Sequence, residues 1–188
     1  MIAGWLASSG LAFGAWRDET STALPNAHRR GRRTCSEDIT MAMKVRAATV
    51  DDSLALASLA GQLGYAASVH EVESRLRGLE AATEHRVLVA CLEGGPLIGW
   101  IHVFISLRVE SEPFGEIGGL VVAEGQRRTG IGSSLVGHAE EWLKARGIET
   151  LRVRSRSTRV DAHVFFQQAG FSMSKNQRIF DKRITLDS

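Results

Sequence analysis

The sequence predicts a mixed α/β (or α+β) domain, in which helices cover both faces of a mixed sheet. Three observations lead to this fold class. Short apolar runs rich in β-branched residues alternate with amphipathic stretches of helical period. Thr-x-x-Asp and Ser-x-x-Glu sequences, which favour helix starts, begin the first two helical stretches. Glycine follows several of these stretches, where it favours a helix end. The expected element order is β-α-α-β-β-β-α-β-α-β-β.

The composition is that of an ordinary globular protein. The chain has 188 residues, of which 44% are hydrophobic and 23% charged, and this favours a single domain. A net charge of +2 gives no case for a nucleic-acid partner, and no run approaches the ~18 apolar residues of a membrane span. Cys35 and Cys91 are the only cysteines, so we expect no metal site, no disulfide framework and a cytoplasmic setting.

The first forty residues differ in character from the rest. They hold Trp5, Trp16 and four arginines between positions 29 and 33. A solvated charge run explains these arginines better than contact with nucleic acid or membrane. We interpret residues 1–42 as a disordered tail or a spurious N-terminal extension, and residues 43–188 as the domain. Deletion of residues 1–42 should then change neither stability nor activity, and a large loss of either would contradict this interpretation.

Apolar periodicity divides the first half of the domain. The predicted elements are, in order, a strand at 44–48, a helix from Thr49 to Gly64, a helix beginning at Ser68, a strand at 85–92, a hairpin turn at 93–95 and a strand at 97–107. The second half continues with a strand at 116–122, a helix at 131–146, a strand at 151–155, a helix at 161–169, and an antiparallel pair at 171–173 and 179–184. The glycines Gly118 and Gly119 within one strand indicate a bulge or a close approach by another backbone or a ligand.

A basic, glycine-containing turn joins the fourth predicted strand to the next helix. Its sequence from Arg127 is Arg-Arg-Thr-Gly-Ile-Gly, which is neither a P-loop nor a dinucleotide fingerprint. A strand that leads into a helix through such a turn directs backbone N–H groups and the positive end of the helix dipole at one place. The N–H groups of 128–133 therefore suit a pyrophosphate, with Arg127 and Arg128 pairing with its oxygens. The alternative is that the arginines are surface charges and the glycines only shape a turn.

This turn and its surroundings resemble the GCN5-related N-acetyltransferases. The matching features are the Arg/Gln-x-x-Gly-x-Gly/Ala motif from Arg127, the Ile98–Trp100 sequence, and Ala162–Phe166 leading into Ala169–Phe171. The resemblance covers roughly Lys44 to Ile184. It implies a mostly antiparallel, twisted sheet of six to seven strands, with helices on both faces and a splay between the fourth and fifth strands. It also allows a homodimer, a common assembly in the family.

The resemblance implies acetyl-CoA as co-substrate. The implied cofactor-binding residues are the strand backbone beside the splay and the motif with its helix start: Leu120, Val121, Val122, Arg127, Arg128, Thr129, Gly130, Ile131, Gly132 and Ser133. The implied activity is transfer of an acetyl group to a primary amine of a small molecule, by direct attack in a ternary complex. The alternatives are a protein lysine or N-terminal acetyltransferase and a non-catalytic acyl-CoA-binding module.

Glu116 is the candidate general base, because relatives that acetylate protein lysines carry a glutamate in a similar Phe-x-Glu-Ile setting. A structural or substrate-binding carboxylate is the alternative role. The candidates for the acceptor pocket are Tyr65, Trp100, His102 and Glu112. Acidic residues there would favour a cationic amine. Phe166 stands where many relatives have a tyrosine, and Arg159 where many have an asparagine. The identity of the general acid therefore stays open between water, a hydroxyl of Ser157 or Thr158, and unassisted departure of the thiolate.

Overall fold

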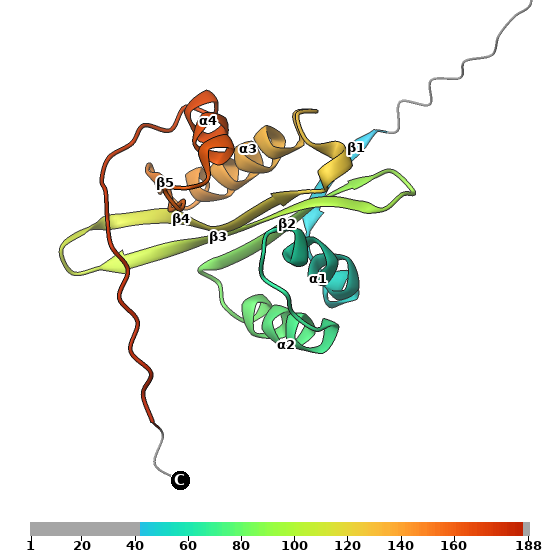
Figure 1. The fold of residues 1–188 in the computed structure, drawn as a ribbon, viewed down its shortest axis with the longest axis horizontal. Coiled ribbons are helices and arrows are strands. Elements are labelled where there is room, and N and C mark those ends of the chain that lie inside the picture. Colours follow the sequence, from blue (N-terminus) through green and yellow to red (C-terminus); the bar gives the residue numbers. More distant parts are fainter. Residues whose placement is uncertain (1–41, 186–188) are drawn as a thin grey trace, which may run out of the picture. The chain divides into compact units, whose positions relative to one another are not determined.

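Five strands form the sheet of the computed structural model, which describes residues 42–185 (Figure 1). Their spatial order follows their order in the sequence, from β1 to β5. The first four strands pair antiparallel, and β5 pairs parallel with β4. The strands are β1 (Met43–Ala47), β2 (His85–Leu92), β3 (Leu97–Arg108), β4 (Ser111–Val122) and β5 (Leu151–Val153).

Helices cover both faces of this sheet, as predicted (Figure 1). One pair lies on one face, α1 (Ser53–Gln62) and α2 (Val69–Glu80), and the other pair lies on the opposite face, α3 (Ile131–Lys144) and α4 (Val160–Gln168). The predicted start of α2 is confirmed in detail. The side chain of Ser68 accepts a hydrogen bond from the N–H of Glu71 at 3.2 Å, and Glu71 accepts in return from the N–H of Ser68.

The larger core lies between the sheet and α3. Alternate residues of β3, such as Ile101 and Val103, are fully buried there against Leu135 and Leu143 of α3. A smaller cluster, centred on Leu56, Leu76 and Val89, holds α1 and α2 on the other face. The period-2 pattern of β3 therefore sends one set of side chains to each core, and the set that faces α1 and α2 includes Trp100.

The strands β4 and β5 separate after three pairs. Gly115, Glu116 and Ile117 pair with β5, whereas β4 continues to Val122 without it. At the same point the register with β3 shifts, since His102 pairs with Gly119 and Val103 with Ile117. Gly118 is the extra residue of this bulge. The expected splay between the fourth and fifth strands therefore begins at the two adjacent glycines.

The strand count differs from the expectation of six to seven. Segments 171–173 and 179–184, expected to form an antiparallel pair, are not strands, and residues 172–185 make no backbone hydrogen bond within the described chain. The physical reason is that this segment buries little apolar surface. Ile179, Phe180 and Ile184 each keep at least three quarters of their surface exposed, so nothing offsets the cost of ordering a strand pair at the sheet edge.

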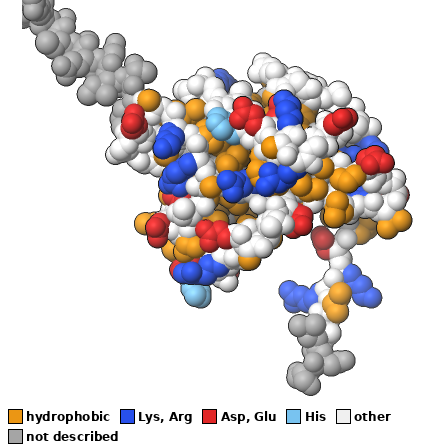
Figure 2. Space-filling model, turned by 180° about the vertical axis from the view of Figure 1, so that it is seen from behind, with side chains coloured by type: hydrophobic (Ala, Val, Ile, Leu, Met, Phe, Trp, Pro, Cys, Tyr) orange, Lys and Arg blue, Asp and Glu red, His pale blue; other side chains and the backbone are white. Residues whose placement is uncertain are grey.

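The proposed boundary near residue 42 separates the sheet domain from residues that lie outside the described range, so the tail interpretation stays a prediction. Among residues 42–185, no helix has the length and apolar content needed to cross a membrane. Figure 2 shows one face of the molecule, on which several Lys and Arg side chains lie across the middle beside hydrophobic side chains.

Candidate active site

The turn before α3 leaves a set of backbone donors free. The N–H of Ser134 is the first to bond inside the helix, to the carbonyl of Gly130 at 3.0 Å. The N–H groups of Gly130, Ile131, Gly132 and Ser133 therefore have no partner from the helix ladder. No side chain caps this end of α3. The helix start thus presents several donors and the positive end of its dipole to one anion.

Local contacts hold this turn in shape. Arg128 has a left-handed backbone, with φ of 63°, and Gly130 has φ of 87°, a conformation that only glycine adopts without cost. The hydroxyl of Thr129 donates to the carbonyl of Gln126 at 2.7 Å. The side chain of Arg127 donates to the carbonyl of Val122 at 3.4 Å, and its guanidinium lies 4.0 Å from Glu124. Both predicted arginines are exposed at the turn, where they can reach phosphate oxygens.

The second glycine of the motif has a packing role that the sequence did not reveal. A Cβ atom on Gly132 would lie 3.0 Å from the ring of Phe165 and 3.8 Å from Val122. Gly132 therefore lets α4 pack closely on the start of α3. Gly130, in contrast, has open space around it and is required for its backbone conformation.

The end of β4 provides an open edge beside this turn. Leu120, Val121 and Val122 pair with β3 on one side, and on the other side β5 has already diverged. Their outward N–H and C=O groups can therefore pair with an extended ligand arm as an added strand would. An open strand edge leading to a helix start rich in free donors fits an elongated ligand with a pyrophosphate, so the predicted cofactor residues suit acetyl-CoA.

A pocket of about 550 Å³ lies on the opposite side of the sheet, between α1, α2 and the bulge of β4. Its floor includes Gly118, Gly119 and the ring of Trp100, and Tyr65 stands at its wall. A Cβ atom on Gly119 would lie 2.8 Å from the Trp100 ring, and one on Gly118 would lie 3.1 Å from His102. The adjacent glycines therefore keep the space open where β4 leaves β5. Tyr65 and Trp100, two of the residues predicted for the acceptor pocket, thus line the same cavity, and their role in binding stays a prediction.

Glu116 is buried on the same face as the pocket floor. It pairs with Phe104 across the sheet, and Phe104 also faces the missing Cβ of Gly118. Two residues of strand place Glu116 about 7 Å from Gly118. Its Oε2 lies 3.2 Å from a guanidinium nitrogen of Arg154 and 3.9 Å from one of Arg108. Its Oε1 makes no hydrogen bond within residues 42–185, so this oxygen is available to a ligand or a water molecule.

His102 does not act as a free base in this arrangement. Its Nε2 lies 3.0 Å from Nδ1 of His85. The His85 ring stacks on Phe104, whereas the His102 ring is tilted against it by 41°. Burial, with a smaller contribution from the neighbouring His85, lowers the pKa of His102 to about 4. The ring is therefore neutral near pH 7 and is too weak a base to take a proton from an ammonium group. His102 lies beside Gly118 but does not itself line the pocket.

Three other predicted features are placed as follows. Glu112 is exposed in the first part of β4 and does not line the pocket. The ring of Phe166 packs against Phe165 and Phe171, with centroids 5.2 and 5.4 Å apart, so it serves the core. Arg159 donates to the carbonyl of Leu63 at 2.6 Å and ties the start of α4 to the end of α1. This arginine therefore links two elements beside the pocket.

The arginines of β5 and of the loop after it were not among the predicted site residues. Arg152, Arg154 and Arg156 alternate with other residues, and this period-2 pattern was the available signal. Leu151 and Val153 pack in the core on the α3 face, so the arginines point to the face of α1 and α2. Arg152 lies 3.9 Å from the centroid of the Phe114 ring, Arg154 pairs with Glu116, and Arg156 contacts Tyr65.

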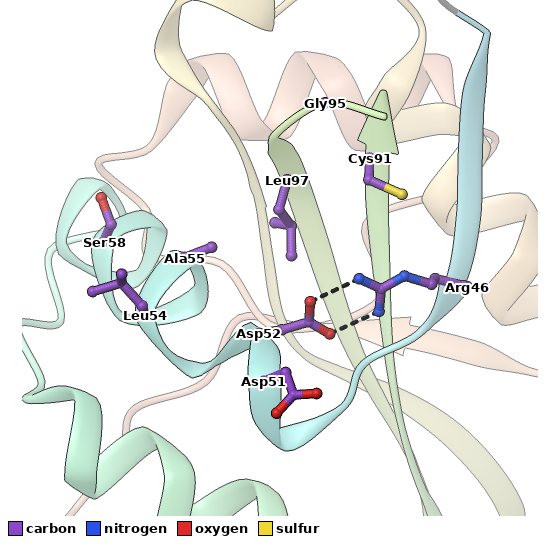
Figure 3. Close-up of a pocket in the computed structure, with 9 residues that line it drawn as sticks. All are labelled: Arg46, Asp51, Asp52, Leu54, Ala55, Ser58, Cys91, Gly95 and Leu97. Carbon is purple, nitrogen blue, oxygen red and sulfur yellow. Dashed lines mark hydrogen bonds and ion pairs between the residues drawn. The ribbon is translucent and has the colours of Figure 1, made fainter. Parts of the chain in front are cut away.

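A second pocket, of about 500 Å³, lies near the other edge of the sheet (Figure 3). Figure 3 shows the guanidinium of Arg46 facing the carboxylate of Asp52 through two contacts, each of 2.7 Å. These hydrogen bonds lower the pKa of the Asp52 carboxyl below its usual range. The Cys91 thiol lies 3.5 Å from the carbonyl of Lys44. The Arg46–Asp52 pair ties β1 to the start of α1. The second pocket shares no lining residue with the first.

Comparisons with known proteins agree with this arrangement. The model of the acetyltransferase (GNAT) family matches residues 56–171, more than half of the chain. An aminoglycoside N(6')-acetyltransferase type 1 of Stenotrophomonas maltophilia is 28% identical over 153 residues, which cover 79% of this chain and 97% of that protein.

Solved structures share the fold. The structure of AAC(6')-Iy in complex with the bisubstrate analogue CoA-S-monomethyl-acetylneamine superposes with a TM-score of 0.68 at 17% identity, covering 76% of this chain and 99% of that one. Glucosamine-6-phosphate N-acetyltransferase from Arabidopsis thaliana superposes with a TM-score of 0.65 at 21% identity, covering 74% and 99%. The chain belongs to the GNAT family and is an acetyl-CoA-dependent N-acetyltransferase.

Proposed function

We propose that the protein acetylates a primary amine of a small molecule held in the pocket beside Gly118 and Gly119. The observation that carries this proposal is the position of the pocket. It opens where β4 leaves β5, and the same strand continues along the open edge to the start of α3. A donor held along that edge and an acceptor in the pocket would meet at the splay. This proximity favours direct transfer in one ternary complex.

The amine must lose a proton before it attacks, since a free primary amine has a pKa near ~10. Glu116 is the proposed proton acceptor, through Oε1 and either directly or through one water molecule. Its ion pair with Arg154 holds the carboxylate in place. Acetyl-CoA supplies the activated acetyl group as a thioester. We propose that a backbone N–H near Val121 or Val122, where β5 has diverged from β4, donates to the carbonyl oxygen of that group as negative charge develops on it.

The departing sulfur needs a proton from a group other than Phe166. The Phe166 ring lies within a cluster of phenylalanines and has no proton to donate. Ser157 and Thr158 are exposed in the loop after β5, and no hydrogen bond orients their hydroxyl groups within the described residues. We propose that water supplies this proton.

The relatives support a small acceptor. The curated relative is by name an enzyme that acetylates aminoglycosides, and its length matches this chain almost completely. Thiol release measured over a panel of amines and peptides, together with calorimetric titration of acetyl-CoA, tests the proposal. Turnover on a small amine supports it, turnover only on peptides favours the protein-modifying alternative, and binding without turnover favours a non-catalytic module.

Substitution of Glu116 tests its role. Glu116→Gln should lower kcat by ~10²–10⁴. It should also remove the fall in rate toward low pH that reports protonation of a general base. Glu112→Gln is the matched control, because Glu112 is exposed on the same strand and does not line the pocket. Equal pH–rate profiles for the wild type and Glu116→Gln would reject Glu116 as the base.

A further inference from the structure

Arginine side chains surround the proposed acceptor pocket. Arg75 is one of its lining residues. Arg156 donates to the hydroxyl of Tyr65 at 3.4 Å, and Arg159 donates to the carbonyl of Leu63 at 2.6 Å. Tyr65 and Leu63 both line the pocket. One guanidinium group, from α2, therefore lines this cavity, and two more, from the loop after β5 and from the start of α4, contact residues that line it.

Carboxylates do not balance these charges. Within residues 42–185, neither Arg156 nor Arg159 has a carboxylate at ion-pair distance. Arg75 lies 3.7 Å from Glu71, but both side chains are more than half exposed, so solvent screens this pair. The charge at the wall of the pocket is therefore positive.

Glu116 does not reverse this balance, because its charge is shared between two arginines. Both Arg154 and Arg108 approach the same oxygen of the carboxylate. Arg154 is also nearly half exposed and so can reach a further partner on the pocket side of the sheet. One carboxylate beside two guanidinium groups leaves a net positive charge next to the pocket floor.

We propose that the acceptor amine carries an anionic group, a carboxylate or a phosphate, which Arg156 recognises with Arg154 at the rim of the pocket. This inference rests on the proposed function and narrows its substrate class. The planar guanidinium donates two parallel hydrogen bonds to a carboxylate or phosphate, so arginines suit this recognition. The cationic acceptor expected from candidate acidic residues is disfavoured, since Glu116 is paired and Glu112 lies outside the pocket.

The arginines act on the acceptor rather than on the cofactor phosphates because of their positions. The free donors for a pyrophosphate lie at the start of α3, on the opposite face of the sheet. Arg156 instead contacts Tyr65, in the segment between α1 and α2. Titration of acetyl-CoA into an Arg156 variant separates the two assignments.

The first experiment compares matched amines on the wild-type protein by thiol release. One pair is glucosamine 6-phosphate against glucosamine, and the other is an amino acid against its amide. These pairs separate recognition of a phosphate from recognition of a carboxylate. A polycationic aminoglycoside is tested as a third kind of acceptor, one without an anionic group. We expect kcat/KM at least ~10-fold higher for the member of one pair that carries the phosphate or carboxylate. Equal or higher kcat/KM for the members without the anionic group and for the aminoglycoside would overturn the inference.

The second experiment tests Arg156 itself. Arg156→Gln should lower the ratio of kcat/KM between the anionic and neutral members to near one, with Kd for acetyl-CoA unchanged. Arg156→Lys keeps the positive charge but not the planar guanidinium, so it should retain part of the ratio. It also tests the inference if the Arg156→Gln variant folds poorly. The matched control is Arg77→Gln, because Arg77 pairs with Glu73 on the exposed surface of α2. An unchanged ratio in Arg156→Gln, or weaker acetyl-CoA binding, would overturn the assignment.

Failure of this inference differs from failure of the proposed function. Thiol release with only neutral or cationic amines would leave the acetyltransferase function intact and reject anion recognition. If no amine released thiol, the proposed function would fail. Calorimetric titration of glucosamine 6-phosphate and of the amino acid into the CoA complex would then decide, since binding supports anion recognition and absence of binding rejects it.

Discussion

The start of α3 and the pocket beside Gly118 differ in how far apart their parts stand in the sequence. The proposed phosphate-binding half is a short continuous segment, from Val122 to Ser133, and its main-chain donors and turn conformation arise locally. The acceptor half combines α1, α2, β3, β4 and the loop after β5, up to 91 positions apart for Arg156 and Tyr65. Local chemistry thus determines the first half, whereas strand register and helix packing determine the second.

The largest effect should come from breaking the continuous half. Gly132→Leu would force its side chain against Phe165 and displace the start of α3. Loss of about two charged hydrogen bonds to phosphate should weaken acetyl-CoA binding about 100-fold, with a smaller effect on the acceptor KM. Calorimetric titration measures this. Gly137→Ala on the same helix, where a Cβ atom meets nothing within 4 Å, is the control. Unchanged Kd in Gly132→Leu would show that the pyrophosphate binds elsewhere.

The opposite pattern should come from breaking the assembled half. Gly119→Val would place its side chain on the Trp100 ring and narrow the pocket floor. A narrowing that costs about 2 kcal/mol of acceptor binding would raise the acceptor KM about thirtyfold and leave Kd for acetyl-CoA nearly unchanged. Steady-state kinetics with each substrate varied in turn checks this. A variant that loses acetyl-CoA binding and keeps the acceptor KM would contradict the division of the site into two halves.

The partly buried histidine pair should make the stability of the domain depend on pH. The unfolded chain binds a proton at His102 below pH 6.5, but the folded protein does so only near pH 4. The free energy of unfolding should therefore fall as pH decreases between these values, by about 2 kcal/mol, because the ring is only partly shielded. Urea unfolding of the wild type and His102→Phe at pH 7 and pH 4 measures the difference. Equal pH dependence in the two proteins would reject this coupling.

The smallest effect on function should come from the second pocket. Asp52→Asn would weaken the hydrogen bonds to Arg46 and lower the free energy of unfolding by about 1–2 kcal/mol. Neither acetyl-CoA binding nor the acceptor KM should change by more than about twofold. Thermal unfolding and steady-state kinetics check the two parts. A large rise in either KM would mean that this edge of the sheet also belongs to the site.

The comparison of the two halves also explains which features the sequence could predict. The turn from Arg127 to Gly132 and the capping box at Ser68 depend on neighbours a few residues away, and both were identified. The contacts of Arg154 with Glu116 and of His85 with His102 depend on register between separate strands, so periodicity alone could not pair them. The last two strands were wrong, because apolar residues such as Ile179 and Phe180 suggested burial that the fold does not provide.

Hydrogen exchange at the start of α3 tests the central claim most directly. The amides of Gly130 to Ser133 have no acceptor in the helix ladder and should exchange rapidly in the free protein. Acetyl-CoA should slow their exchange, together with that of Leu120 to Val122, and should leave the capped start of α2 at Ser68 unchanged. Unaltered exchange at the start of α3 in the presence of saturating acetyl-CoA would contradict the account.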